Sequence, residues 1–273
     1  MLLKGERTKV VRDAGGFIAR INMPGWLARW PRDHGYGPLA MVVESLLEPG
    51  CQIAMHEHRD DEIVSWVPDG VMRHDDRANG KLVVDAGHLM VMNAGRSFWH
   101  SEETLKTDPP LRMLQILMRP EEAGLEPGIQ FGPLAERVSG QWRHLVGPEL
   151  GEAPFFVRNT IDIFDIALAA GERVEAPRIA CRHCYLYQFS GDARIGDEQL
   201  AEGEQLLQCS DDPLAVEASS ASVLVAFLVD PSAPIARQGT VGDHHSVPRP
   251  AFVPLVRGLL SARECWRRWR TGK

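Results

Sequence analysis

The stretch that decides the fold is residues 50–102, which opens with GCQIAMHEHRDDE and closes with DAGHLMVMNAGRSFWHSE. His56 and His58 stand two residues apart near its start. His100 and Glu102 stand two apart at its end. In a β-strand, side chains two residues apart project from the same face, so two facing strands can bring all four to one point. Three imidazoles and one carboxylate suit a first-row transition metal, whereas Ca²⁺ and Mg²⁺ prefer oxygen ligands. We therefore expect one metal ion per chain, bound within this stretch.

The intervening sequence is typical of short strands joined by tight turns. The apolar runs EIVSWV, KLVV and HLMVM are punctuated by Gly70, Gly80 and Gly87. A His-x-His pair often occurs by chance, so the first two histidines alone would also fit an ordinary strand. The strands between the two pairs can return the chain to the same barrel, and this order favours a metal site.

Both ends of the stretch also carry a family resemblance. HEHRDDEIVSWVPDG and AGHLMVMNAGRSFWHSE resemble the two metal-binding motifs of the pirin-like bicupins, which belong to the cupin superfamily. Three departures from the family pattern, at Ala86, His88 and the pair Asp60 and Asp61, leave the ligand positions intact. The resemblance implies an all-β fold of two tandem antiparallel jelly-roll (cupin) barrels, with Fe in the N-terminal one. The ligand types alone leave Zn, Ni, Cu, Mn and Co open.

Two glutamates compete for the role of fourth ligand. Many cupins use the glutamate of the first motif, here Glu62, whereas the pirin-like pattern uses the glutamate after the last histidine, here Glu102. Glu102 shares a strand face with His100, while the residues Arg59-Asp60-Asp61 before Glu62 can shift its register. We expect Glu102 to be both a metal ligand and the catalytic base. Glu62 is expected to lie behind the ligands and orient a histidine or a bound water.

The chain contains an internal repeat. ESLLEPGCQIAMHEHRDDEIVSWVPDG resembles DIALAAGERVEAPRIACRHCYLYQFSG at an offset of 121 residues, and DAGHLMVMN resembles AEGEQLLQC at an offset of 116. A repeat of this length indicates two tandem copies of one β-domain. At these offsets the four expected ligands are replaced by residues that do not bind metals, namely Pro177, Ile179, Val216 and Ala218. We therefore expect the second copy to be structural.

Domain boundaries follow from the repeat and from a stretch rich in proline and glycine. We expect a metal-binding barrel in residues 1–120, a linker with the first strands of the second domain in 121–160, a barrel without metal ligands in 161–233, and a tail in 234–273. Within the tail, Ser261 and Glu264 have capping-box spacing, which predicts a short C-terminal helix with a solvated basic face.

Composition excludes several classes of partner. The 273 residues carry a formal net charge of −7, which disfavours nucleic acid, and no apolar run approaches the length of a membrane span. The first residues lack the apolar core of a signal peptide, and the cysteine count of five is odd. We therefore expect a cytoplasmic protein with reduced thiols, in which Cys181 and Cys184 are strand residues rather than a redox pair.

The resemblance also carries a functional expectation. Similar proteins of this family have been described as quercetin dioxygenases, which open a flavonol ring with O₂. This implies a small aromatic substrate, O₂, and a pocket in which Trp66, Phe98 and Trp99 could pack a flat ring. Pirin itself resembles a metal-dependent binding protein that modulates a transcription complex, so the alternative is a redox or metal sensor with a protein partner. Fold alone does not decide between them, whereas O₂ uptake with a flavonol does.

Overall fold

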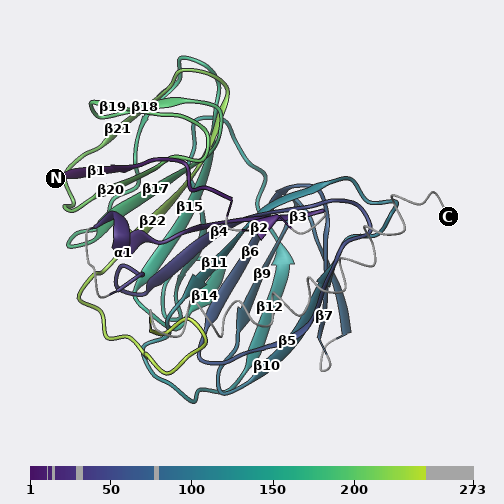
Figure 1. The fold of residues 1–273 in the computed structure, drawn as a ribbon. Coiled ribbons are helices and arrows are strands. Elements are labelled where there is room, and N and C mark those ends of the chain that lie inside the picture. The colour runs from purple at the N-terminus through teal and green to yellow at the C-terminus, as the bar shows by residue number, and fades with distance from the viewer. Residues whose placement is uncertain (11, 14–15, 29–32, 77–79, 244–273) are drawn as a thin grey trace. The chain divides into compact units, whose positions relative to one another are not determined.

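The computed structural model describes residues 1–10, 12–13, 16–28, 33–76 and 80–243 (Figure 1). Within these ranges the secondary structure is β-strand except for one short helix, α1 (Pro24–Leu27). The described part of the chain has no helix long and apolar enough to cross a bilayer. The all-β fold class is confirmed, while the helix expected at Ser261 to Glu264 lies outside the described residues.

The described chain divides into two compact units. The first barrel contains residues 9–22, 40–134 and 235–243, and the second barrel contains residues 1–8, 23–39 and 135–234. Each unit has one seven-stranded and one four-stranded sheet. This pairing of a large and a small sheet in both units is the architecture that the internal repeat predicts.

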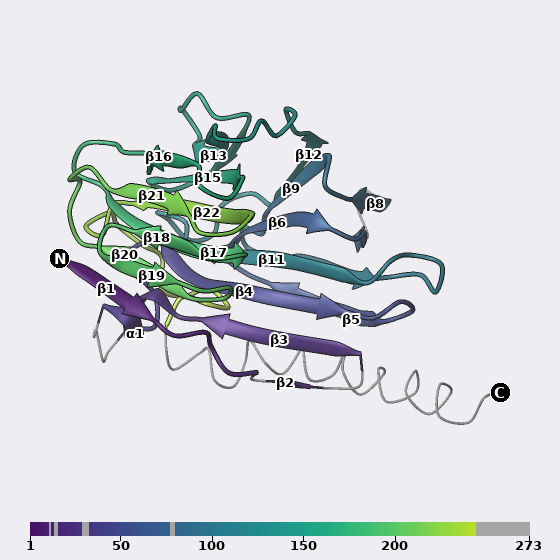
Figure 2. The ribbon, with the colours of Figure 1, turned by 90° about the horizontal axis from the view of Figure 1, so that it is seen from above.

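In the first barrel the large sheet has the order β12-β9-β6-β11-β4-β3-β2, and the small sheet has the order β5-β10-β7-β8. Figure 2 shows β3, β4, β11 and β6 side by side. The strands are β2 (Arg12–Asp13), β3 (Phe17–Asn22), β4 (Leu39–Leu47), β5 (Gln52–His58), β6 (Glu62–Asp69), β7 (Met72–Asp76), β8 (Gly80–Val84), β9 (His88–Asn93), β10 (Phe98–Glu103), β11 (Leu111–Met118) and β12 (Gly128–Pro133).

The turn between β6 and β7 shows why these strands end where they do. Gly70 has a φ of +89°, a left-handed conformation that glycine adopts without steric cost. A Cβ atom at this position would lie 2.5 Å from the carbonyl oxygen of Pro110. Glycine is therefore required where the chain leaves the large sheet for the small one, because the turn packs directly against the backbone of Pro110 and Leu111.

The second barrel repeats this topology. Its large sheet has the order β1-β20-β17-β22-β15-β13-β14, and its small sheet has the order β16-β21-β18-β19. The strands are β1 (Leu2–Gly5), β13 (Arg143–Pro148), β14 (Phe155–Val157), β15 (Ile161–Leu168), β16 (Arg173–Glu175), β17 (His183–Ser190), β18 (Ala193–Ile195), β19 (Glu198–Leu200), β20 (Gln205–Gln208), β21 (Ala215–Ala218) and β22 (Ser222–Val229). Strands β17, β20 and β21 take the places of β6, β9 and β10, as the offsets of 121 and 116 require.

The units differ from the consecutive blocks expected from the sequence. Strand β1, at the start of the chain, pairs with β20 in the second barrel. Strand β12, from the expected linker, pairs with β9 in the first barrel. Because β9 and β20 are equivalent strands, β12 and β1 fill the same edge position in the two copies. Strand β1 therefore lies in the block 1–120, which the sequence assigns to the first barrel, but it belongs to the second barrel. Strand β12 lies in the block 121–160, which the sequence assigns to the linker and the second domain, but it belongs to the first barrel.

The second barrel is closed by apolar side chains at the positions that correspond to the expected ligands. Val216 and Ala218, which replace His100 and Glu102, are buried in a hydrophobic cluster, and Ile179, which replaces His58, packs against it. The interior of the second barrel is therefore filled like an ordinary protein core.

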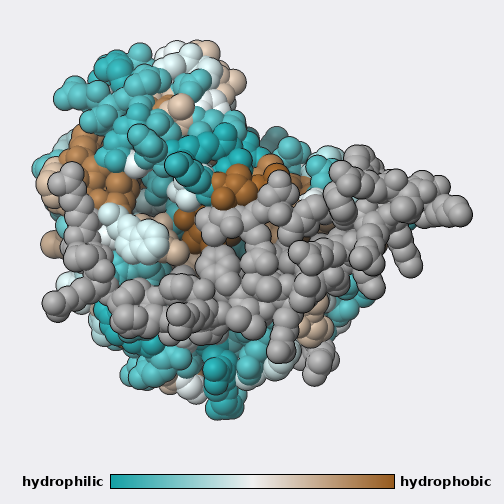
Figure 3. Space-filling view, in the orientation of Figure 1, coloured by the Kyte–Doolittle hydropathy of each residue, from teal (hydrophilic) through white to brown (hydrophobic). Residues whose placement is uncertain are grey.

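On the face seen in Figure 3, the described surface is mainly hydrophilic and its hydrophobic residues form separate patches.

Candidate metal centre

Neighbouring strands of the small sheet bring three of the four expected ligands together. In the pairing of β5 with β10, His56 lies opposite His100, and His58 lies opposite Phe98. One ligand nitrogen from each of His56, His58 and His100 falls within 4.8 Å of the others. The ring centroids of His56 and His100 are 4.4 Å apart. The spacing of two residues thus has the consequence expected from it, because all three rings share the inner face of the sheet.

A β-bulge in β5 sets which side chains lie beside Glu102 on this inner face. The pairing shifts between His100 and Glu102, so that Glu102 lies opposite Ile53 rather than opposite Ala54. The extra residue in β5 changes which side chains point inward, and both Ile53 and His56 therefore line the same cavity. Sequence spacing alone does not reveal this change of parity.

Each histidine has its Nδ1 atom engaged, which leaves Nε2 for another partner. His56 Nδ1 donates to the carbonyl oxygen of Ala54 at 2.9 Å, and His58 Nδ1 donates to Asp61 Oδ2 at 2.9 Å. His100 Nδ1 lies 3.3 Å from the Nδ1 atom of His74. In the described structure, His100 Nε2 is buried and has no hydrogen-bond partner. A buried nitrogen lone pair aimed at two other imidazoles fits a metal ion, because metal-bound histidines commonly donate their other N–H to the protein.

Burial also keeps these imidazoles in the form that binds metals. Desolvation, together with the smaller effect of the neighbouring His58, lowers the pKa of His56 to about 3. Desolvation likewise moves the pKa of His100 well below its usual value and lowers the pKa of His74. His56 and His100 are therefore neutral at pH 7, and metal ligation requires the neutral ring.

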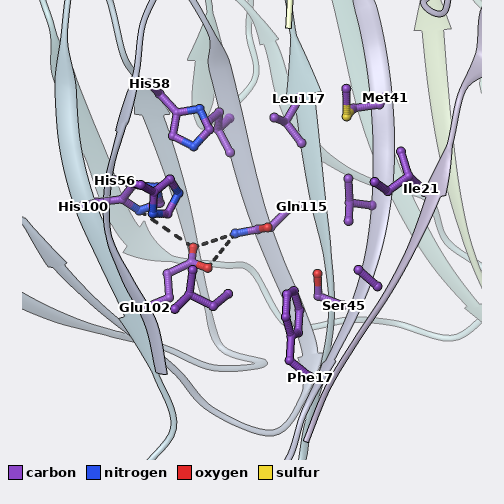
Figure 4. Close-up of a pocket in the computed structure, with 14 residues that line it drawn as sticks. Phe17, Ile21, Met41, Ser45, His56, His58, His100, Glu102, Gln115 and Leu117 are labelled. Atoms are coloured by element: carbon purple, nitrogen blue, oxygen red, sulfur yellow. Dashed lines mark hydrogen bonds and ion pairs between the residues drawn. The ribbon is translucent and has the colours of Figure 1, made fainter. Parts of the chain in front are cut away.

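Glu102 lies in the same cavity, beside the three rings (Figure 4). Its two carboxylate oxygens accept hydrogen bonds of 2.6 and 2.8 Å from Gln115 Nε2 on β11. Glu102 Oε1 lies 3.9 Å from His100 Nδ1. Burial raises the pKa of Glu102 to about 7, so this carboxyl group exchanges a proton near neutral pH. The geometry suits a base or a fourth ligand, and both roles remain predictions.

The rest of the cavity is aliphatic, with Phe17 as an aromatic ring at one end (Figure 4). Its walls come from odd-numbered residues of β3, β4, β6 and β11, as the alternation of a strand requires. The cavity has a volume of about 50 Å³. Besides Phe17, Ile53, the three histidines, Glu102 and Gln115, the lining residues are Ala19, Ile21, Met41, Val43, Ser45, Ile63 and Leu117.

The aromatic residues expected to line the pocket lie elsewhere. Trp66 is buried, but Ile63 faces the cavity from the same strand, so Trp66 projects from the opposite face of β6. Trp99 is 42% exposed, because it alternates with the inward-facing His100. Phe98 is buried with its ring centroid 6.3 Å from that of His74. The pocket wall is therefore aliphatic where the sequence predicts aromatic rings.

Glu62 also points away from the cavity. It is fully buried on the opposite face of β6 from Ile63, and it accepts a hydrogen bond from Asn93. The carboxylate that orients His58 belongs to the preceding residue, Asp61. Sequence reasoning shifted this contact by one residue, because the backbone turns at Asp60, which has a φ of +50°.

Three further residues belong to the site beyond those that the two sequence motifs supply. His74 and Asp76 on β7 are buried behind His100, and Gln115 on β11 holds Glu102. The spacing of Met72, His74 and Asp76 was a usable signal, because residues two apart on a strand share a face. Gln115 sits in an apolar strand, LRMLQILM, where a single amide indicates a buried hydrogen bond.

Each of the two units combines a seven-stranded sheet with a four-stranded sheet, and one unit holds a cluster of three histidines. This combination is typical of a bicupin fold. A family model for pirin matches residues 33–118, which contain all three clustered histidines. Residues 33–118 thus form a pirin-family domain, and the described part of the chain has a bicupin fold.

Known proteins that resemble the chain include enzymes and structures of this family. Quercetin 2,3-dioxygenase of Escherichia coli K12 is 24% identical over 217 residues, which cover 76% of this chain and 93% of that protein. The crystal structure of YhhW from Escherichia coli has a TM-score of 0.73 at 21% identity, covering 84% of this chain and 97% of that chain. The structure of the bacterial pirin YhhW in complex with nickel(II) has a TM-score of 0.71 at 22% identity, covering 86% and 100%. These structural likenesses establish the fold.

Proposed function

We propose that the chain is a metal-dependent dioxygenase that acts with O₂ on a flavonol-like substrate. The observation that carries the proposal is the convergence of three imidazoles beside one buried carboxyl group, with His100 Nε2 buried and without a hydrogen-bond partner in the described structure. His56, His58, His100 and Glu102 would hold the metal, and iron is the metal that the family resemblance implies. The name of the relative from Escherichia coli supports the reaction class.

Each residue around the centre would have a separate role in an oxygenase reaction. When bound, the metal would supply a Lewis-acidic position for a substrate oxyanion and for O₂. Glu102, with a pKa of about 7, is placed to accept the proton of a substrate hydroxyl group. The amide of Gln115 fixes that carboxylate by donating to both of its oxygens. The aliphatic wall from β3 and β4 excludes water from the opposite side.

Cavity size constrains how a flavonol could bind. A cavity of about 50 Å³ holds a few water molecules, whereas an engineered cavity of roughly 150 Å³ binds benzene. A flavonol would therefore enter with one hydroxyl-bearing edge and leave most of its rings at the mouth, or the aliphatic wall would move. A smaller aromatic diol would leave less of its ring outside the cavity, and we include one in the test.

The test is O₂ uptake by protein loaded anaerobically with Fe(II) and then given quercetin or catechol. We expect uptake that needs both the metal and an aromatic substrate, and that is lost in the His100→Ala variant. Parallel loading with Ni(II), Mn(II) and Co(II) identifies the metal that supports turnover. Absence of uptake with every metal would contradict the proposal and favour the sensor interpretation. Equal uptake by the variant would also contradict the proposal, because the reaction would not depend on the histidine cluster.

A further inference from the structure

Strand β7 places two polar side chains directly behind His100. His74 and Asp76 project from the inner face of β7 and are 0% and 2% exposed. His74 Nε2 lies 3.1 Å from Asp76 Oδ2, and His74 Nδ1 lies 3.3 Å from His100 Nδ1. The His74 and His100 ring centroids are 5.1 Å apart. A carboxylate, an imidazole and a candidate metal ligand thus form one continuous chain of contacts.

This chain of contacts fixes the protons on both rings. A carboxylate accepts hydrogen bonds, so the His74 nitrogen beside Asp76 carries the N–H. A neutral imidazole has one N–H, so His74 Nδ1 presents a lone pair to His100. His100 Nδ1 must then donate, and His100 Nε2 is left with the lone pair that a metal requires. The reverse assignment would place an N–H on His100 Nε2, which is buried and has no partner in the described structure.

We propose that His74 and Asp76 form a positioning relay that holds His100 in the tautomer and orientation that bind a metal through Nε2. The proposal rests on the metal centre proposed above. The relay does for His100 what the Ala54 carbonyl does for His56 and what Asp61 does for His58. His74 is not itself a ligand, since both of its nitrogens are engaged within the relay.

The position of His100 in the sheet explains why it needs such a relay. Strand β10 lies between β5 and β7, so its backbone groups are committed to the two flanking strands. His100 is 1% exposed, which leaves its Nδ1 atom dependent on a neighbouring side chain. The inner face of β7 is the adjacent source, because Asp76 pairs with His100 and His74 pairs with Glu102 in the β7–β10 register.

The second barrel provides an internal comparison. Val216 and Ala218 replace His100 and Glu102 there, and they pair with Ile195 and Ala193 on β18. All four side chains belong to one buried hydrophobic cluster. The copy that lacks the ligand positions thus also lacks the relay positions, and the same fold is filled with apolar residues. Barrel packing alone therefore does not require His74 and Asp76.

The test compares two pairs of variants by the affinity for Co(II), measured by competition with a chromophoric chelator. His74→Asn keeps a carbonyl oxygen that can accept from His100 Nδ1, and His74→Leu has a similar shape without an acceptor. We expect His74→Leu to weaken Co(II) binding by roughly 10- to 100-fold and His74→Asn to weaken it much less. Asp76→Leu should weaken binding, whereas Asp75→Leu, at the neighbouring partly exposed position on β7, should not. Equal losses in His74→Leu and His74→Asn would overturn the proposal.

A second measurement needs no variant and no bound metal. The ¹⁵N chemical shifts of the imidazoles report which ring nitrogen carries the proton. In metal-free protein we expect His100 with its proton on Nδ1 and His74 with its proton on Nε2. The opposite tautomers would overturn the relay even if the oxygenase reaction is observed. The expected tautomers would support the relay even if no substrate is turned over, so the two proposals can fail separately.

Discussion

Asp61 accepts the Nδ1 hydrogen of His58 at 2.9 Å. The other oxygen of Asp61 accepts the backbone N–H of Val241 at 3.2 Å. Beside it, Thr240 donates its N–H to the carbonyl oxygen of Arg59 and accepts the N–H of Arg59 through Oγ1, at 2.8 and 2.9 Å. The segment that follows the second barrel in sequence therefore belongs to the support of the candidate centre in the first barrel.

Asp61→Asn is expected to weaken metal binding by roughly 10- to 100-fold, because it removes the negative charge that orients His58. Isothermal titration with Ni(II) measures the effect. Asp60→Asn is the matched control, since asparagine tolerates the positive φ of that position and the Asp60 carboxylate accepts the backbone N–H of Gly124 rather than a proton of His58. Equal affinities of the two variants would contradict an orienting role for Asp61.

The stoichiometry of the protein provides a second prediction. Elemental analysis of protein purified without a chelator or a histidine tag should find one metal ion per chain. The double variant His56→Ala and His58→Ala should bind none, because two of the three clustered nitrogens are lost. Two metal ions per chain in the unaltered protein would contradict the assignment of a structural role to the second barrel.

The same double variant should remain folded. The second barrel carries Pro177 and Ile179 at the corresponding positions, so the barrel tolerates apolar side chains there. Circular dichroism should show unchanged strand content, with a cooperative thermal transition. A variant that unfolds would mean that the histidines support the barrel itself, and metal loss would then not identify ligands.

Sequence alone predicted the fold and the histidine cluster because both depend on a period of two. His56, His58 and His100 meet since each pair of motif residues shares a strand face, and the repeat predicted the second barrel by its constant offsets. These features are local along the chain or repeated within it, and they need no knowledge of tertiary contacts.

Sequence reasoning missed what depends on register and on distant segments. Because of the bulge in β5, both Ile53 and His56 point inward although they are three residues apart. No residue type in this stretch predicts the bulge. The contact from Val241 to Asp61 joins residues 180 positions apart. Trp66 does not line the cavity because Ile63 points into it, and Trp66 therefore lies on the opposite face of β6. A single parity error of this kind moves every side chain of a strand to the other face.

An ion pair at the end of β10 predicts a pH effect on stability. Arg73 on β7 donates two hydrogen bonds of 2.8 Å to Asp108, and these hold the pKa of Asp108 at about 2, below its usual value of 3.8. Because the folded-state pKa is depressed, the ion pair stabilises the fold above pH 3.8 and this stabilisation is lost as the pH falls through 2.

Arg73→Met should therefore lower the Tm at pH 7 by no more than about 4 °C, since the pair is partly exposed. The difference from the unaltered protein should shrink as the pH approaches 2. Arg96→Met removes the more exposed ion pair with Glu126 and serves as the control. A difference in Tm that stays constant from pH 7 to pH 2 would show that Arg73 acts by packing rather than through its charge.

The last prediction separates the two glutamates. Glu102 lies in the cavity beside the histidines, whereas Glu62 projects from the opposite face of β6 and accepts from Asn93. The isosteric variant Glu102→Gln should lower metal affinity by roughly 100-fold or more, because it would remove a charged ligand rather than an outer contact. It should also abolish O₂ uptake, because the amide cannot accept the substrate proton.

Glu62→Gln should leave both properties close to those of the unaltered protein, since its carboxyl group does not reach the cavity. Equilibrium dialysis with Ni(II) and O₂ uptake with the supporting metal measure the two effects separately. If Glu62→Gln empties the site while Glu102→Gln keeps it full, the fourth ligand is Glu62. The strand must then rearrange on metal binding, because Ile63 and Glu62 cannot face the cavity from one regular strand at the same time.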